Sequence, residues 1–341
     1  MKKHIHFIGV TALTFTILYG FSACTGDYNT IQIEIEMAAI PAGRFLMGSP
    51  DSEVADSAYR ERPQREVVLT KGFRMGKYLI TQNQYQTVMG NNPSYHRKHI
   101  LPAEVNENNL PVERVSWYDA VEFCNRLSEL EERSMAYTID KNTPDANQRD
   151  ISDGWKWTVK LNTGTNGYRL PTEAQWEYAC RAGTTTPFNT GETITTDQAN
   201  FNGNTYGGTS PGKNLGRTSE VGAYPANAWG LYDMHGNVYE FCWDWVFEFT
   251  HTPVIGSPAY EYAIEHGFDG TEFIDYYNAA PNPDYDPLGQ PYGERRAERG
   301  GTYQHDPISA RSAYRERIRL YDKRRYDLGF RVVLPLDGET W

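Results

Sequence analysis

The second half of the chain carries no sustained periodicity, and this limits its architecture more than any other feature. From residue 183 onward, glycine, asparagine and aromatic residues are frequent, and few stretches repeat apolar positions at helical spacing. Glycine and proline interrupt regular elements, and the chain contains 30 glycines and 19 prolines. We therefore predict an α+β fold that is irregular and loop-rich, with few short strands and helices. No tandem repeat or linker divides it, so a single domain is expected.

Three short helices are marked by residues typical of helix starts. Thr81 precedes residues 82–89, and Ser116 precedes residues 117–130, where apolar residues recur at helical spacing. A proline introduces the third helix, which is predicted over residues 172–182.

Strands are predicted near the N-terminal end of the domain. Residues 40–48 have the pattern of a strand that ends in a turn. Residues 66–69 and 73–78 are strand-like and are separated by a short Thr-Lys-Gly turn. This arrangement predicts a hairpin.

The N-terminus has the pattern of an export signal. Two lysines precede an apolar run over residues 5–20, and small residues then lead into Cys24. We predict a lipoprotein signal peptide over residues 1–23, with a lipid attached to Cys24 after cleavage. A plain signal peptide or a short membrane anchor is the alternative, although the run is short for a membrane span. Residues 24–36 are polar and predict a tether to the domain.

The charge of the chain narrows the range of partners. Its formal net charge is −11, which disfavours nucleic acid and anionic membranes as general partners. Contact with a membrane is therefore expected only through the N-terminal lipid. We expect a monomer in the cell envelope, lipid-anchored at the outer membrane and exposed at the surface.

Three cysteines follow Cys24 in the sequence. Cys124, Cys180 and Cys242 each lie among aromatic and apolar residues. We predict that they are small buried hydrophobic residues and that no disulfide framework exists.

Six motifs occur in a fixed order along the chain. They are Ile-Pro-Ala-Gly-x-Phe-x-Met-Gly at residues 40–48, Pro-Val-Glu-x-Val-Ser-Trp-Tyr-Asp-Ala at 111–120, Gly-Tyr-Arg-Leu-Pro-Thr-Glu-Ala-Gln-Trp-Glu-Tyr-Ala at 167–179, Trp-Gly-Leu-Tyr-Asp-Met-His-Gly-Asn-Val-Tyr-Glu at 229–240, Arg-Gly-Gly-Thr-Tyr at 299–303 and Leu-Gly-Phe-Arg-Val-Val at 328–333. This series resembles the sulfatase-modifying, formylglycine-generating-enzyme family, whose fold is a variant of the C-type lectin fold. The resemblance covers residues 37–335 and implies one C-type-lectin-like domain of the formylglycine-generating-enzyme type.

The resemblance also identifies what this chain lacks. The enzymes of the family use a copper-binding cysteine pair, and the corresponding residues 304–310 contain no cysteine. Since a thiolate is needed to bind Cu(I), we expect no formylglycine-generating activity and no enzyme of this kind. Non-haem iron oxidases form another branch, and this chain lacks their histidine-bearing helical domain. The pair His96 and His99 is a possible metal site, but a solvated loop is favoured because Arg97 and Lys98 separate the two.

A calcium site is implied by the resemblance. Two carboxylates seven residues apart surround a glycine turn, and calcium prefers oxygen ligands. The implied ligands of the structural calcium are Asp233, the carbonyls of Gly236 and Val238, and Glu240. A second family site would begin at Asn200 and Phe201. The alternative is that the two carboxylates only hydrogen-bond the turn.

The segment of residues 299–331 is predicted to carry the binding surface. Residues 295–331 hold eleven Lys and Arg against five acids, and residues 304–327 follow no regular period. In lectin-type folds this stretch faces the ligand, and the arrangement resembles the variable proteins of diversity-generating retroelements. A solvated basic face is the alternative. The candidate ligand-binding residues are Tyr303, His305, Asp306, Ile308, Ala310, Ser312, Tyr314, Glu316, Arg317, Arg319, Tyr321 and Tyr326.

These observations predict a non-catalytic, surface-displayed lipoprotein. It would bind an unknown protein or small ligand through its C-terminal, lectin-type face. One alternative is an oxidoreductase of the same family that uses non-haem iron or another cofactor. Another is a structural lipoprotein of the envelope.

Overall fold

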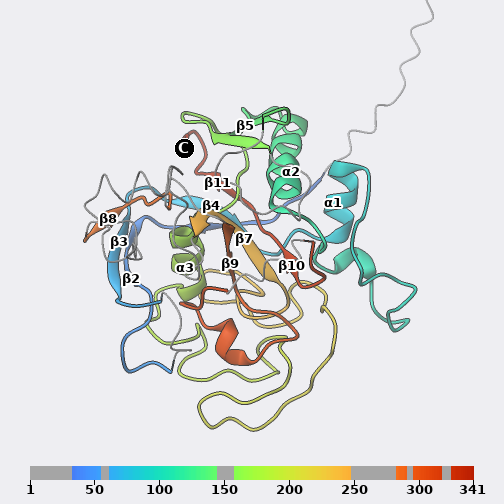
Figure 1. The fold of residues 1–341 in the computed structure, drawn as a ribbon, viewed down its shortest axis with the longest axis vertical. Helices are drawn as coiled ribbons and strands as arrows, with labels where there is room; N and C mark the ends of the chain where they lie inside the picture. The colour runs from blue at the N-terminus through green and yellow to red at the C-terminus, as the bar shows by residue number, and fades with distance from the viewer. Residues whose placement is uncertain (1–32, 55–60, 144–156, 247–281, 290–294, 317–323) are drawn as a thin grey trace, which may run out of the picture. The chain divides into compact units, whose positions relative to one another are not determined.

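The computed structural model describes residues 33–54, 61–143, 157–246, 282–289, 295–316 and 324–341 (Figure 1). The predicted signal peptide, Cys24 and the first part of the predicted tether lie outside these residues. None of the helices in the described ranges is both long enough and apolar enough to cross a bilayer.

Short strands form several small sheets rather than one large one. The first sheet has the order β1 (Met37–Ile40), β4 (Phe73–Gly76), β11 (Val333–Pro335), and the second has the order β2 (Gly43–Met47), β3 (Arg65–Leu69), β8 (Asp284–Tyr285). The third has the order β10 (Leu328–Gly329), β7 (Tyr239–Val246), β9 (Arg295–Arg299), and β5 (Tyr137–Asp140) pairs with β6 (Thr158–Leu161). The prediction of an α+β, loop-rich fold with short elements is confirmed.

The hairpin predicted near residue 70 is wrong, although both of its strands exist. β3 pairs with β2 and β8, whereas β4 pairs with β1 and β11. The backbone N–H of Thr70 donates to Asp286 Oδ1 at 2.8 Å instead of closing a turn. The chain therefore passes from one sheet to another at this point, because β3 and β4 pair with different strands instead of with each other.

The three predicted helices are confirmed. They are α1 (Gln82–Met89), α2 (Trp117–Leu130) and α3 (Glu173–Arg181), and each begins with a capping box on Thr81, Ser116 or Thr172. In a capping box the side chains of the first and fourth residues bond each other's backbone N–H groups. Figure 1 shows α3 beside the strands, and it contacts β2, β7 and β9. Two 3-10 helices, η1 (Glu107–Asn109) and η2 (Pro307–Ala310), were not predicted.

Two large clusters of buried side chains form the core, and both join residues from distant parts of the sequence. In one of them Phe330 is fully buried, with its ring centroid 5.2 Å from that of Phe123 and 6.4 Å from that of Tyr85. The three predicted buried cysteines are confirmed as free and buried.

The predicted tether is too long at its C-terminal end. Ile33 and Ile35 pack against the core, and the backbone N–H of Lys77 donates to the carbonyl of Glu36 at 2.8 Å. Alternate residues of this stretch are exposed, so it resembles a strand edge more than a free linker.

Replacing Phe330 with alanine is expected to lower the free energy of unfolding by about 3–5 kcal/mol, because a buried ring is lost and a cavity remains. Urea denaturation of the folded domain measures this. Leu130→Ala is the control, since Leu130 is 57% exposed and its loss is expected to stay within about 0.5 kcal/mol. Equal losses for the two variants would contradict the assignment of Phe330 to the core.

Candidate functional site

Buried ion pairs hold the C-terminal segment to the rest of the domain. Arg299 on β9 lies 2.9 Å from Glu173 Oε1 and also pairs with Glu177, both of which are on α3. All three side chains are at most 2% exposed. Burial alone would raise the pKa of Glu177, but Arg181 and Arg299 outweigh it and hold that pKa below its usual value.

A second buried group involves Arg311. Its guanidinium lies 2.6 Å from Glu53 Oε1 and 2.7 Å from Glu61 Oε2, and none of the three side chains is more than 3% exposed. Arg311 follows η2, so these pairs fix the middle of the segment that was predicted to be displayed. This part of the segment therefore belongs to the interior.

The excess of basic residues does not form a basic surface in the described structure. Five of the eleven basic residues are buried, and they are Arg295, Arg296, Arg299, Arg311 and Arg331. Arg315, Arg324 and Arg325 are partly buried and pair with acids. The sequence predicted either a displayed basic binding face or a solvated basic face. For these eight residues both predictions are wrong. The other three basic residues lie outside the described ranges.

The predicted binding residues divide into interior and surface groups. Tyr303, Ala310, Ser312 and Tyr314 are buried, and this corrects their assignment as displayed contacts. His305, Ile308 and Glu316 are partly exposed, and Asp306 and Tyr326 are exposed. Arg317, Arg319 and Tyr321 lie outside the described residues.

The exposed members meet residues that the sequence did not single out. The ring of Tyr326 lies 5.9 Å from that of Tyr95, and both residues are more than 40% exposed. Asp306 Oδ1 accepts from Asn202 Nδ2 at 2.6 Å and also from Asn204. We call the seven surface residues of this region the C-terminal face, and they are Tyr95, Asn202, Asn204, His305, Asp306, Glu316 and Tyr326.

Glu316 links the C-terminal face to the interior. Its Oε2 accepts from the hydroxyl of Tyr314 at 3.1 Å and from that of Tyr239. Burial, followed by the charge of Glu316, raises the pKa of both phenols. The two hydroxyls therefore stay protonated and act as fixed donors, which hold the carboxylate in one position.

The two carboxylates predicted as calcium ligands differ in whether all of their oxygens already have hydrogen-bond partners. Asp233 is buried, and its Oδ2 accepts from the N–H of Gly222 at 2.7 Å, whereas its Oδ1 has no hydrogen-bond partner. Both oxygens of Glu240 accept from the guanidinium of Arg331, at 2.6 and 2.8 Å. The unpartnered oxygen of Asp233 fits a cation, whereas the charge of Glu240 is already balanced. Gly236, in the adjacent turn, has a φ angle of 81°. A Cβ atom at this position would clash with the carbonyl of Asn200.

Asn200, the predicted start of a second calcium site, is buried among oxygen atoms. Its Nδ2 donates to the carbonyl of Arg217 at 3.0 Å and to Ser219 Oγ at 3.3 Å, and its Oδ1 has no partner. The amide supplies donors where a cation would require an oxygen. In this orientation Nδ2 faces the surrounding oxygen atoms, and the neighbouring Phe201 is part of a small buried apolar cluster.

The histidine pair considered as a metal site is split. His96 is only 4% exposed, its Nδ1 lies 3.3 Å from Glu113 Oε1, and its ring contacts Tyr303. His99 is exposed. The prediction of a solvated loop is therefore wrong for His96 and right for His99. No group of three or more His, Cys, Asp or Glu that could hold a metal occurs in the ranges that the structure describes.

A buried cysteine and histidine lie close together but are not arranged for nucleophilic catalysis. Cys180 Sγ lies 3.8 Å from His235 Nε2, which accepts from the N–H of Asn189 at 3.0 Å. His235 Nδ1 lies 2.6 Å from the carbonyl of Ala310 and so carries the proton. Burial raises the pKa of Cys180 to about 12 and lowers that of His235 to about 4. A neutral thiol beside an imidazole with both nitrogens occupied is not an activated pair.

The chain belongs to the family of the sulfatase-modifying factor enzyme 1-like domain, whose family model matches residues 28–336. Among solved structures, Treponema denticola variable protein 1 is similar with a TM-score of 0.63 and 28% identity, over 90% of this chain and 98% of that one. PvdO from Pseudomonas aeruginosa has a TM-score of 0.59 and 25% identity, over 90% and 97%. The predicted resemblance and the C-type-lectin-like fold of the formylglycine-generating-enzyme type are confirmed.

Curated relatives carry different functions in their names. The chaperone protein LppX of Paenibacillus barcinonensis is 35% identical over 262 residues, which are 72% of this chain and 82% of that protein. The formylglycine-generating enzyme of Mus musculus is 26% identical over 286 residues, 79% of this chain and 66% of the enzyme. The family therefore includes enzymes, and membership alone does not assign an activity.

Replacing Arg311 with alanine is expected to destabilise the domain by about 3–5 kcal/mol, because Glu53 and Glu61 would lose their buried partner. Asp306→Ala, five residues earlier in the same segment, is expected to change stability by no more than about 0.5 kcal/mol. Urea denaturation of both variants measures the two free energies of unfolding and so distinguishes an interior residue from a surface residue. A stable Arg311→Ala protein would show that the segment is not fixed by this group.

Proposed function

We propose that this protein is a non-catalytic, lipid-anchored binding protein that presents its C-terminal face to a ligand. The observations that carry the proposal are the exposed pair Tyr95 and Tyr326 and the exposed polar group that Asp306 forms with Asn202 and Asn204. Tyrosine rings give a large contact area at low entropic cost, and amide groups add adaptable hydrogen bonds. Such surfaces suit recognition better than catalysis.

The cysteine content supports a role other than formylglycine formation. Residues 304–310, where the resemblance places the catalytic pair, hold no cysteine. The free cysteines Cys124, Cys180 and Cys242 are buried, and burial raises the pKa of each thiol. A thiolate is the reactive form, so these residues do not replace the missing pair.

The similarity to the treponemal variable protein supports a binding role. The two structures share the fold over 90% of this chain. Four residues of the C-terminal face, His305, Asp306, Glu316 and Tyr326, lie on the segment that the sequence resemblance associates with diversified binding. The relative named as a chaperone favours a second candidate. In that case the same exposed tyrosines would contact client proteins without selecting one sequence.

A triple variant of the C-terminal face tests the binding proposal. Peptides are first selected on the folded domain from a random display library. Changing Tyr95, Asp306 and Tyr326 together to alanine is expected to weaken binding of the selected peptides by at least about tenfold, since aromatic anchors dominate the binding energy of interfaces. Tyr285→Ala is the matched control, because Tyr285 is 61% exposed and lies on β8.

The results of that experiment have distinct meanings. Retained binding by the triple variant would contradict the proposed face. If the wild type selects no consensus peptide but suppresses aggregation of an unfolded protein through the same residues, chaperone activity replaces selective binding.

We also propose a structural calcium ion next to Asp233. The support is the buried Asp233 Oδ1, which has no hydrogen-bond partner, and the family resemblance, which implies the carbonyls of Gly236 and Val238 as further ligands. An ion that binds only the native state stabilises it by about 2.7 kcal/mol at a hundredfold excess over its Kd. Chelation is therefore expected to lower the Tm of the wild type and to leave that of Asp233→Asn less affected. An identical Tm with and without chelator in the wild type would refute the calcium site.

Lipid attachment at Cys24 forms part of the same proposal. Its support is the apolar run and the small residues before this cysteine. Wild-type protein is expected to enter the detergent phase of a phase-separation assay, and Cys24→Ser to stay in the aqueous phase. Protease treatment of intact cells then tests exposure at the outer surface. Equal recovery of both proteins in the aqueous phase would contradict lipidation.

A further inference from the structure

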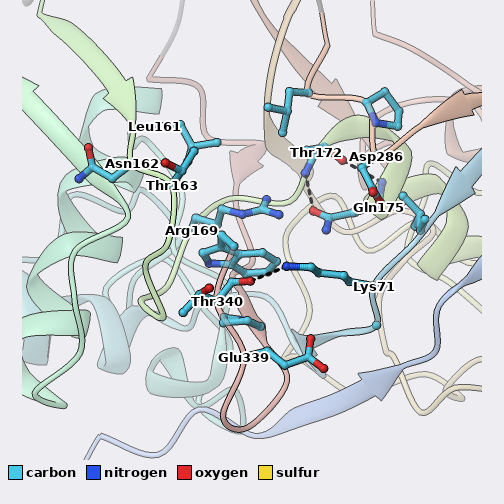
Figure 2. Close-up of a pocket in the computed structure, with 16 residues that line it drawn as sticks. Lys71, Leu161, Asn162, Thr163, Arg169, Thr172, Gln175, Asp286, Glu339 and Thr340 are labelled. Atoms are coloured by element: carbon cyan, nitrogen blue, oxygen red, sulfur yellow. Dashed lines mark hydrogen bonds between the residues drawn. The ribbon is translucent and has the colours of Figure 1, made fainter. Parts of the chain in front are cut away.

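A pocket separate from the C-terminal face lies beside the first turn of α3. Its cavity volume is about 220 Å³, and none of the residues of the C-terminal face lines it. Figure 2 shows Arg169, Lys71 and Gln175 around it, with Asn162 and Thr163 at one side. Leu69, Leu161, Pro287 and Leu288 contribute apolar surface. The pocket thus combines positive charge with an apolar wall.

Arg169 is the unusual residue of this pocket. It is only 4% exposed, and its Nη1 donates to the carbonyl of Leu170 at 2.8 Å. Its Nε has no hydrogen-bond partner, and no ion pair joins it to a carboxylate in the described part of the chain, although the charge of Asp244 acts to raise its pKa. A buried guanidinium normally pairs with an acid, because an unpaired buried charge is costly.

The ring of Trp341 holds this guanidinium in place without neutralising it. The centre of the guanidinium lies 3.6 Å from the ring centroid, which is a close cation–π contact. Burial lowers the pKa of Arg169 to about 10, so the group remains charged at neutral pH. In Figure 2 its nitrogens point toward the side of the pocket where Gln175 and Lys71 stand.

The acids of the pocket do not compensate for Arg169. Both oxygens of Asp286 accept from Thr70, one from its N–H and one from its hydroxyl. Glu339 is exposed to solvent. Lys71, Asp286 and Glu339 are all exposed, so the buried charge of the lining is the positive one of Arg169.

The first turn of α3 forms another part of the pocket lining. Thr172 and Gln175 line the pocket and form the capping box of the helix. The N–H of Glu173 is already bonded to Asp244 Oδ2 at 2.7 Å. A carboxylate therefore already occupies this helix end, and Arg169 supplies the donors for a ligand.

We propose that this pocket binds the carboxylate of a small, partly apolar molecule, with Arg169 as its main contact and Lys71 at its rim. A planar carboxylate matches the fork of a guanidinium. The cavity is smaller than the roughly 300–1,000 Å³ of pockets for drug-sized ligands, which limits the size of the occupant. Phosphate would leave the leucine and proline wall in contact with water, so an apolar body is part of the ligand.

The test uses three probes on the folded domain in calorimetric titrations. N-acetyl-L-leucine has the charge and the apolar body, N-acetyl-L-leucinamide has the body alone, and inorganic phosphate has the charge alone. We expect saturable binding of N-acetyl-L-leucine, and binding of the amide and of phosphate that is at least about tenfold weaker. The reason is that hydrogen bonds between charged groups are the strong ones. Equal binding of acid and amide, tighter binding of phosphate, or no binding of the acid would each overturn the proposal.

Variants locate the binding. Arg169→Lys keeps the charge but loses the forked guanidinium. It is expected to weaken binding of N-acetyl-L-leucine at least about tenfold. Lys71→Gln is expected to weaken it about two- to fivefold, and Lys213→Gln, an exposed lysine that does not line the pocket, to have no effect. Leu288→Trp adds bulk at a side chain that is 52% exposed and is expected to block binding without changing the charge.

These variants also keep the proposal independent of the C-terminal face. Circular dichroism confirms that each variant is folded, and Lys71→Gln and Leu288→Trp decide the result if Arg169→Lys does not fold. The triple variant of the C-terminal face is expected to bind the acid as the wild type does. Unchanged affinity in Arg169→Lys and Leu288→Trp would refute this site, whatever the fate of the proposed function.

Discussion

The carboxylate of Glu177 is the point on which much of the structure depends. It accepts from the N–H of Gly48 at 2.9 Å, lies 2.8 Å from the guanidinium of Arg181 and also pairs with Arg299. One buried acid thus joins the turn after β2, the helix α3 and the strand β9. Strands of two to eight residues give few ladder hydrogen bonds, so cross-links between irregular segments replace them. Losing one partner of such a pair leaves an uncompensated buried charge.

This use of charge explains why the composition of the C-terminal segment is misleading. A local excess of arginine usually indicates a positive surface, but here Arg299, Arg311 and Arg331 are completely buried. Their partners Glu177, Glu61 and Glu240 lie far away in the sequence. The charge of one segment is balanced by acids from other segments, and only the fold shows which acids these are.

Local features were predictable because their causes are local. The helices follow from a capping residue and the apolar pattern behind it, and the family resemblance followed from contiguous motifs. Pairing was not predictable, because the consecutive strands β3 and β4 do not pair with each other: β3 pairs with β2 and β8, and β4 pairs with β1 and β11. Tyr95 was missed as a surface residue for the same reason, since it reaches Tyr326 only through the fold.

The division of the C-terminal segment into buried and exposed residues bears on how one fold can occur in enzymes, chaperones and variable proteins. In this chain Arg311 and Ser312 are fully buried, whereas Asp306 only a few residues away is exposed and hydrogen-bonds Asn202 and Asn204 at the surface. Interior and surface positions occur within one loop, where buried residues such as Arg311 fix the backbone and exposed ones such as Asp306 face solvent. Side chains between these fixed points are then free to change without loss of the fold. A loop anchored in this way can change its chemistry while its geometry stays constant.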